Sequence, residues 1–74
     1  MSMSDIVRER LREVCPTERV SEKDIIEVKR DCRVAFEVIG YIPENFDDAF
    51  QKTWESSDAD DLCDFVFCVW RNDK

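Results

Sequence analysis

The sequence predicts an all-α protein, a compact bundle of three to four short helices with the second helix central. Two observations favour helices. The chain holds one glycine and two prolines in 74 residues, with 43% apolar and 39% charged residues, so it is poor in turn formers and too apolar for disorder. Its apolar residues recur every three or four positions through successive segments, which is the period of an amphipathic helix. At this length, residues 1–74 are expected to form a single acidic helical domain.

The first predicted helix begins with Ser4 as its cap and ends before Pro16, because proline disfavours helical geometry in the residue that precedes it. Its apolar stripe, at intervals of four and three, consists of Val7, Leu11 and Val14. Arginine and glutamate alternate around the rest of the helix, which is typical of a solvated surface.

The second predicted helix is the longest, over about residues 22–39. Ser21 and Asp24 have the spacing of a capping box at its start, and Gly40 suits the left-handed residue that commonly follows a helix. Apolar side chains cover a wide arc of this helix and include, outside the main stripe, Ile26, Val34 and Val38. We therefore expect the other helices to contact this one. The sequence is also compatible with a homodimer, because apolar surface that the other helices do not cover tends to find a partner.

Two further helices are predicted over about residues 44–55 and 58–71. The apolar stripe of the first consists of Phe46, Ala49, Phe50 and Trp54. Ser57 can cap the second. Residues 65–70 also have the composition of a strand, but no second strand is available to pair with them, so a helix is favoured. The predicted core consists of Val7, Leu11, Ile25, Val28, Phe36, Ile39, Phe46, Phe50, Trp54, Leu62, Phe65, Val66 and Val69.

The formal net charge is −7. Residues 1–40 hold nine acids and eight bases, whereas residues 41–74 hold nine acids and three bases, so the acidity belongs to the C-terminal part. Such a surface repels nucleic acid and membrane phosphate, and it attracts basic proteins, including the grooves of proteins that bind DNA or RNA. We therefore expect no direct binding to nucleic acid and none to a membrane.

The chain has no apolar targeting segment near its start and no run that approaches a membrane span. These features predict a cytoplasmic protein. Its four cysteines are expected to be free thiols rather than two disulfides: Cys15, Cys32, Cys63 and Cys68.

The residue types that catalysis requires are scarce. The chain has no histidine, and its single glycine cannot build a phosphate-binding loop. The cysteines lack the paired spacing of a zinc site, and the acids from Asp58 onward do not follow the calcium-loop pattern. An acyl carrier would need a serine preceded by aspartate at a helix start, and neither Ser21 nor Ser57 meets this requirement. We therefore expect no enzyme activity, no catalytic residue, no metal site and no cofactor.

Acidic residues gather in residues 44–64, where eight carboxylates stand against one base, Lys52. On a helix, the apolar stripe of this stretch would turn to one side and the acids to the other. Eight acids along about 30 Å of helix give roughly one charge per 4 Å, and two such helices side by side would approach the density of duplex DNA. The candidate partner-binding residues are Asp47, Asp48, Glu55, Asp58, Asp60, Asp61 and Asp64.

The run Phe46-Asp-Asp-Ala-Phe50, followed by Trp54-Glu-Ser56 and Asp61-Leu62, resembles a segment of the ArdA-type antirestriction proteins, over residues 44–62. Members of that family are small acidic proteins of mobile elements that imitate bent DNA and occupy the DNA groove of type I restriction enzymes. The resemblance implies a mimic surface of Asp47, Asp48, Glu55 and Asp61 above a packing layer of Phe46, Phe50 and Trp54. The chain departs from the family in having Lys52 where glycine is typical and in being less than half as long.

These observations predict a small inhibitor of the phage or mobile-element type. It would occupy the basic nucleic-acid-binding groove of a host defence protein, a restriction enzyme or a CRISPR effector, by DNA mimicry. The alternative is a protein–protein interaction module, such as an adaptor or an immunity protein, that binds through an apolar patch with Tyr41, Phe67 or Trp70 as anchors. The two hypotheses differ in the salt sensitivity of binding, which only the first requires.

Overall fold

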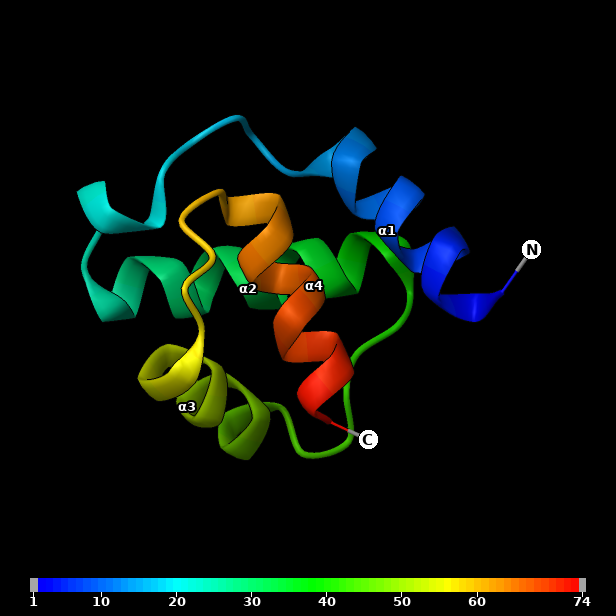
Figure 1. Cartoon of the computed structure of the whole chain (residues 1–74). Helices are drawn as coiled ribbons and strands as arrows, with labels where there is room; N and C mark the ends of the chain where they lie inside the picture. Colours follow the sequence, from blue (N-terminus) through cyan, green and yellow to red (C-terminus); the bar gives the residue numbers. More distant parts are fainter. Residues whose placement is uncertain (1, 74) are drawn as a thin grey trace.

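The computed structural model describes residues 2–73, and within them the chain forms four α-helices and one short 3₁₀ turn (Figure 1). The elements are α1 (Met3–Val14), the turn η1 (Val20–Glu22), α2 (Ile25–Ile39), α3 (Phe46–Ser56) and α4 (Leu62–Asn72). The described residues contain no strand, and residues 65–70 lie inside α4. The all-α prediction is therefore confirmed, and the strand alternative is wrong. None of these helices is long and apolar enough to cross a membrane.

The helix that packs closely against all three others is α4, which therefore takes the central position that the sequence predicts for α2. Six of its eleven residues are buried, against five of the fifteen in α2. In Figure 1, α4 crosses in front of α2, with α1 and α3 on either side. α2 keeps one stripe in the core and leaves much of its wide apolar arc exposed, because α3 and α4 pack mainly against each other.

α1 begins earlier than predicted. The Ser2 hydroxyl accepts the N–H of Asp5 at 3.3 Å and caps the helix in place of Ser4. The residues of its predicted stripe that are buried are Val7 and Leu11. Val14, the last residue of the helix, remains exposed.

α2 begins later than predicted. Asp24 caps it by accepting the N–H of Glu27 at 2.8 Å. Ser21 does not cap the helix, because it lies upstream of the helix start, within η1, where its N–H donates to the side chain of Asp60 at 3.0 Å. At the other end, Gly40 follows the helix as predicted, with a φ of +79°, a left-handed conformation that glycine adopts without strain.

α4 also begins later than predicted, because a loop precedes it. Asp61 caps the helix by accepting the N–H groups of Cys63 and Asp64 at 2.8 and 3.4 Å. The Ser57 hydroxyl accepts the N–H of Ala59 at 3.1 Å and closes a turn within the loop. The prediction of Ser57 as the cap of this helix is therefore wrong.

Aromatic rings from α3 and α4 form the middle of the core. The centroid of the Phe50 ring lies 6.1, 5.9 and 5.7 Å from those of Phe46, Trp54 and Phe65. Most of the predicted core is buried, but Ile25 is exposed in the first turn of α2 and Trp54 is only partly buried. The core also contains residues that the prediction omits: Val20, Cys32, Ala35, Ala49, Thr53, Phe67 and Trp70.

Candidate functional site

Two loops that are distant in sequence are joined at one side of the molecule. The backbone N–H of Val20 donates to the carbonyl of Asp60 at 2.6 Å, and the N–H of Leu62 donates to the carbonyl of Glu18 at 3.0 Å. Between these bonds, Arg19 and Asp61 form an isolated antiparallel bridge. The loop between α1 and α2 is thus held against the loop between α3 and α4.

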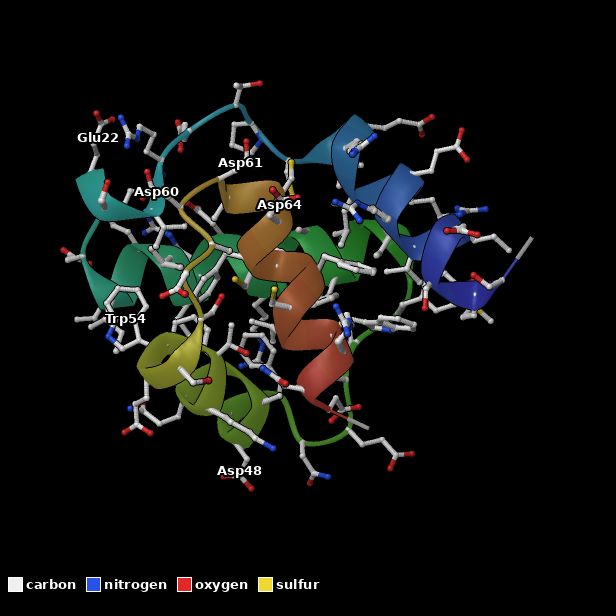
Figure 2. All side chains as sticks on the ribbon, viewed as in Figure 1. Glu22, Asp48, Trp54, Asp60, Asp61 and Asp64 are labelled. Carbon is white, nitrogen blue, oxygen red and sulfur yellow. The ribbon has the colours of Figure 1, made fainter. Side chains whose placement is uncertain are left out.

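We call six of the carboxylates on the joined loops and the first turn of α4 the acidic edge: Glu18, Glu22, Asp58, Asp60, Asp61 and Asp64. Figure 2 shows Glu22, Asp60, Asp61 and Asp64 along the upper side of the molecule. Sequence reasoning missed Glu18 and Glu22, which reach this edge only because the two loops are bonded to each other. No local sequence pattern signals such a contact.

Asp60 fastens the two loops. Its carboxylate accepts the Nε–H of Arg19 at 2.6 Å and the backbone N–H of Ser21 at 3.0 Å. The hydrogen bond from Arg19 is the largest cause that holds the pKa of Asp60 below its ordinary value of 3.8, and the bond from Ser21 adds to it. Asp60 therefore positions the other acids of the edge.

Lys23 ties the same loop to α2. Its ammonium group pairs with Glu18 and, at 2.8 Å, with Asp31. The hydrogen bonds to Asp31 and Glu18 raise the pKa of the Lys23 ammonium group. Because this cation is held by two carboxylates, it offsets only part of the negative charge of the edge.

The remaining members of the acidic edge differ in how much of their charge is available. Asp64 pairs with Arg8 of α1 at 3.5 Å, and Asp61 is occupied in capping α4. Within residues 2–73, neither Glu22 nor Asp58 forms an ion pair. These two carboxylates are the ones most free to meet a basic partner.

The predicted acids of α3 lie elsewhere. Asp48 lies at the opposite side of the molecule from the acidic edge in Figure 2, and Asp47 pairs with Lys29 of α2 at 3.1 Å. Glu55 accepts a hydrogen bond from the preceding turn of its own helix, at 3.3 Å. The expectation of one acidic face along residues 44–64 is therefore wrong, because the loop after α3 redirects the chain and separates these acids from those of α4.

Burial suppresses the reactivity of two of the cysteines, Cys15 and Cys32. All four cysteines are free. The pKa of Cys15 is raised to about 12, chiefly by burial and then by the neighbouring Cys63. Burial also raises the pKa of Cys32. Both groups are protonated thiols at neutral pH and therefore poor nucleophiles. In the part of the chain that the structure describes, no group of His, Cys, Asp or Glu residues is arranged to hold a metal ion.

The apolar anchors expected for an interaction module are mostly inside the fold. Phe67 and Trp70 are each 8% exposed, because α4 is enclosed by the other three helices, and Tyr41 is partly buried. The prediction of Phe67 and Trp70 as surface anchors is therefore wrong. The large aliphatic side chains at the surface include a group on α2 and just after it: Ile26, Val34, Val38 and Ile42.

The carboxylate of Asp60 gives the fold a defined acid sensitivity. Because its pKa is lower in the folded chain than its ordinary value of 3.8, its contribution to stability is complete above that pH. The contribution is lost as the pH falls through the lower, folded value. We therefore expect Asp60→Asn to be less stable than the wild-type protein at neutral pH, and the gap to close in acid. Thermal unfolding followed by circular dichroism over a pH series measures this gap.

The matched control is Asp48→Asn, which removes the same charge from an exposed position without an ion pair in residues 2–73. Its melting temperature should stay close to that of the wild-type protein throughout the series. A gap for Asp60→Asn that stays constant down to the lowest pH at which the chain folds would show that the Arg19 contact adds nothing to stability.

No model of a known protein family, no curated protein and no solved structure matches this chain.

Proposed function

We propose that the protein is an inhibitor that occupies the basic nucleic-acid-binding groove of a host defence protein, a restriction enzyme or a CRISPR effector, through the acidic edge. The observation that carries this proposal is the pair of backbone bonds, Val20 to Asp60 and Leu62 to Glu18, that joins the two acidic loops. They hold carboxylates from both halves of the chain in one place. In this reading the protein acts in the cytoplasm of the host cell, where such enzymes meet DNA.

A fixed array of carboxylates suits a groove that binds phosphates. Such a groove is lined with lysine and arginine, whose contacts with a nucleic acid depend on charge and fall off steeply with salt. Asp60 is held by Arg19 and Ser21 and Asp61 by the start of α4, so the acids do not have to be ordered on binding. The net charge of −7 additionally speeds the encounter with a basic surface.

The resemblance of residues 44–62 to ArdA-type antirestriction proteins supports the same class of target. The proposed contact surface, however, differs from the one that the resemblance implies. Asp58, Asp60, Asp61 and Asp64 belong to the acidic edge, whereas Asp48 lies at the opposite side of the molecule in Figure 2 and Asp47 pairs with Lys29 of α2.

The proposal is tested by DNA-cleavage assays of a purified type I restriction enzyme and a purified CRISPR effector at low salt. The edge variant is Glu22→Gln/Asp58→Asn, because neither side chain forms an ion pair with another residue between positions 2 and 73. We expect the wild-type protein to inhibit at least one enzyme and the edge variant to need about tenfold more protein, since each lost charge weakens a contact with the basic groove.

The control variant is Glu44→Gln/Asp48→Asn, which removes two charges away from the edge: Asp48 lies at the opposite side of the molecule in Figure 2, and Glu44 lines the same surface hollow as Asp48. It should inhibit within about threefold of the wild-type protein, since its changes lie outside the proposed contact. Equal losses of inhibition in both double variants would show that the net charge, rather than the acidic edge, is responsible for inhibition. Inhibition that is unchanged in the edge variant and at raised salt would favour the interaction-module alternative instead.

A further inference from the structure

Two of the four cysteines meet where α1 ends and α4 begins. Cys15 directly follows the last residue of α1, and Cys63 lies in the first turn of α4. The Sγ atom of Cys63 lies 3.8 Å from the carbonyl oxygen of Cys15 and 3.6 Å from that of Leu11. The thiol of Cys15 also forms a hydrogen bond with the thiol of Cys63. Two side chains that are 48 positions apart in the sequence are therefore in direct contact.

The backbone on both sides holds this contact in place. α1 packs against α4, and the N–H of Leu62, the neighbour of Cys63, donates to the carbonyl of Glu18 at 3.0 Å. A disulfide forms without strain only between cysteines that the backbone already sets close together. Because the two thiols are hydrogen-bonded in the reduced fold, joining them requires only a small approach of the side chains.

The pair is open to solvent on one side. Cys15, Cys63 and Arg12 line a surface hollow of about 250 Å³, which is several times the ~30 Å³ that one water molecule occupies in the liquid. A small oxidant such as hydrogen peroxide can therefore reach the thiols. Cys32 is 0% exposed and Cys68 lines a different hollow, so neither shares this opening.

We propose that Cys15 and Cys63 form one modification site, at which a peroxide produces a reversible disulfide between the end of α1 and the first turn of α4. The bond adds a covalent link beside Asp61 and Asp64 of the acidic edge. The proposal follows from the contact between the two thiols and does not depend on the proposed function.

Cys63 is the thiol that reacts first. Burial raises its pKa, as do Asp61 and Asp64. The hydrogen bond from the Cys15 thiol and the charge of Arg12 act in the opposite direction and lower this pKa. The pKa of Cys15, by contrast, is raised by burial, by Cys63 and by nearby carboxylates. Since the thiolate is the nucleophile, Cys63 is the better placed of the two.

In the first step, the Cys63 thiolate attacks one oxygen of hydrogen peroxide. The O–O bond breaks, and the leaving hydroxide takes up the proton that the thiol released, which gives water. Cys63 is thereby oxidised to a sulfenic acid.

In the second step, the Cys15 sulfur attacks the sulfur of the Cys63 sulfenic acid. The S–O bond breaks, and hydroxide leaves with the proton of the Cys15 thiol as water. In total the two thiols give up two protons and two electrons, and the peroxide is reduced to two molecules of water. Cys15 is a poor nucleophile toward a dissolved reagent, but contact with Cys63 supplies the proximity that favours an intramolecular reaction. A thiol reductant reverses the bond by exchange.

Mass spectrometry of the full chain after treatment with hydrogen peroxide tests the proposal. The chain is kept at low micromolar concentration, free thiols are then blocked, and protease fragments are analysed without reduction. We expect one intramolecular bond, between Cys15 and Cys63, which dithiothreitol removes. Cys32→Ala/Cys68→Ala is the matched control, because it keeps only the proposed pair and should form the bond within about threefold of the wild-type rate.

Single variants test the order of the two steps. In Cys15→Ser, the sulfenic acid of Cys63 has lost its partner and should accumulate, where dimedone traps it. In Cys63→Ser, Cys15 should react with peroxide at least about tenfold more slowly than in the wild-type chain, because its thiol is protonated. Circular dichroism establishes that each variant is folded, and alanine serves in place of serine where a variant is not.

Four results would overturn the proposal. Peroxide could leave Cys15 and Cys63 as thiols, the bond could include Cys32 or Cys68, or only bonds between two chains could form. The fourth is a Cys15 that reacts as fast in Cys63→Ser as in the wild-type chain.

Discussion

Replacing Phe50 with alanine is expected to remove about 3–5 kcal/mol of folding free energy, the usual cost of truncating a buried aromatic residue. The side chain is 1% exposed, and its ring lies among those of Phe46, Trp54 and Phe65. Phe50 therefore packs α3 against α4, the central helix. A domain of this length has a total stability of about 4–11 kcal/mol, so the loss amounts to between about a quarter of the stability and all of it.

Urea unfolding followed by circular dichroism measures this loss. Ile42→Ala is the matched control, because it removes an aliphatic side chain that is largely exposed and should change stability by less than about 0.5 kcal/mol. If Phe50→Ala lost no more than the control, the packing of α3 on α4 described above would be wrong.

Replacing Thr53 with valine is expected to cost about 1–3 kcal/mol although it preserves the shape of the side chain. The Thr53 hydroxyl is fully buried, donates to the carbonyl of Ala49 at 2.7 Å and accepts the side-chain N–H of Asn72 at 2.7 Å. Valine offers no acceptor, so the amide of Asn72 loses its partner near the end of α4. This bond fastens the last turn of α4 to α3.

A double-mutant cycle with Asn72→Ala isolates the contact between the two side chains. The double variant Thr53→Val/Asn72→Ala should be less destabilised than the sum of the two single variants, because each single change already removes the shared bond. Strict additivity of the free energies of unfolding would show that the two side chains do not support each other.

The helices could be predicted from the sequence because their signals are local. The apolar stripe of α3, the alternating pattern of α1 and the glycine after α2 each depend on residues within a few turns. The composition of residues 65–70 also fits a strand. The lack of a second strand to pair with them correctly favoured a helix.

The start of α2 could not be predicted in the same way, because the segment before this helix is held by a contact over a long distance. Ser21 has the right spacing for a cap, but its N–H is held by Asp60, which lies 39 positions later in the chain. The choice of α4 over α2 as the central helix has a similar cause. Both helices are apolar over a wide arc, and only their packing decides which arc is covered.

The candidate site shows the same division. The sequence identifies the carboxylates but not which of them are engaged within the fold. Asp60 is held by Arg19, Asp64 by Arg8 and Asp47 by Lys29, and each of these bases belongs to another element. Glu22 enters the acidic edge only through the contact between loops. A pattern of charge in the sequence therefore overstated the length of the acidic face and left out part of the edge.

The most direct test of the proposed function is the salt dependence of competition with DNA. A fluorescent duplex bound to a type I restriction enzyme or a CRISPR effector is displaced by the protein at several salt concentrations, and the affinity of the protein is obtained at each. If the acidic edge enters the basic groove, the logarithm of the affinity should fall linearly with the logarithm of salt, and the slope should be shallower for Glu22→Gln/Asp58→Asn. An affinity that does not change with salt, or a slope that the edge variant leaves unaltered, would contradict the account.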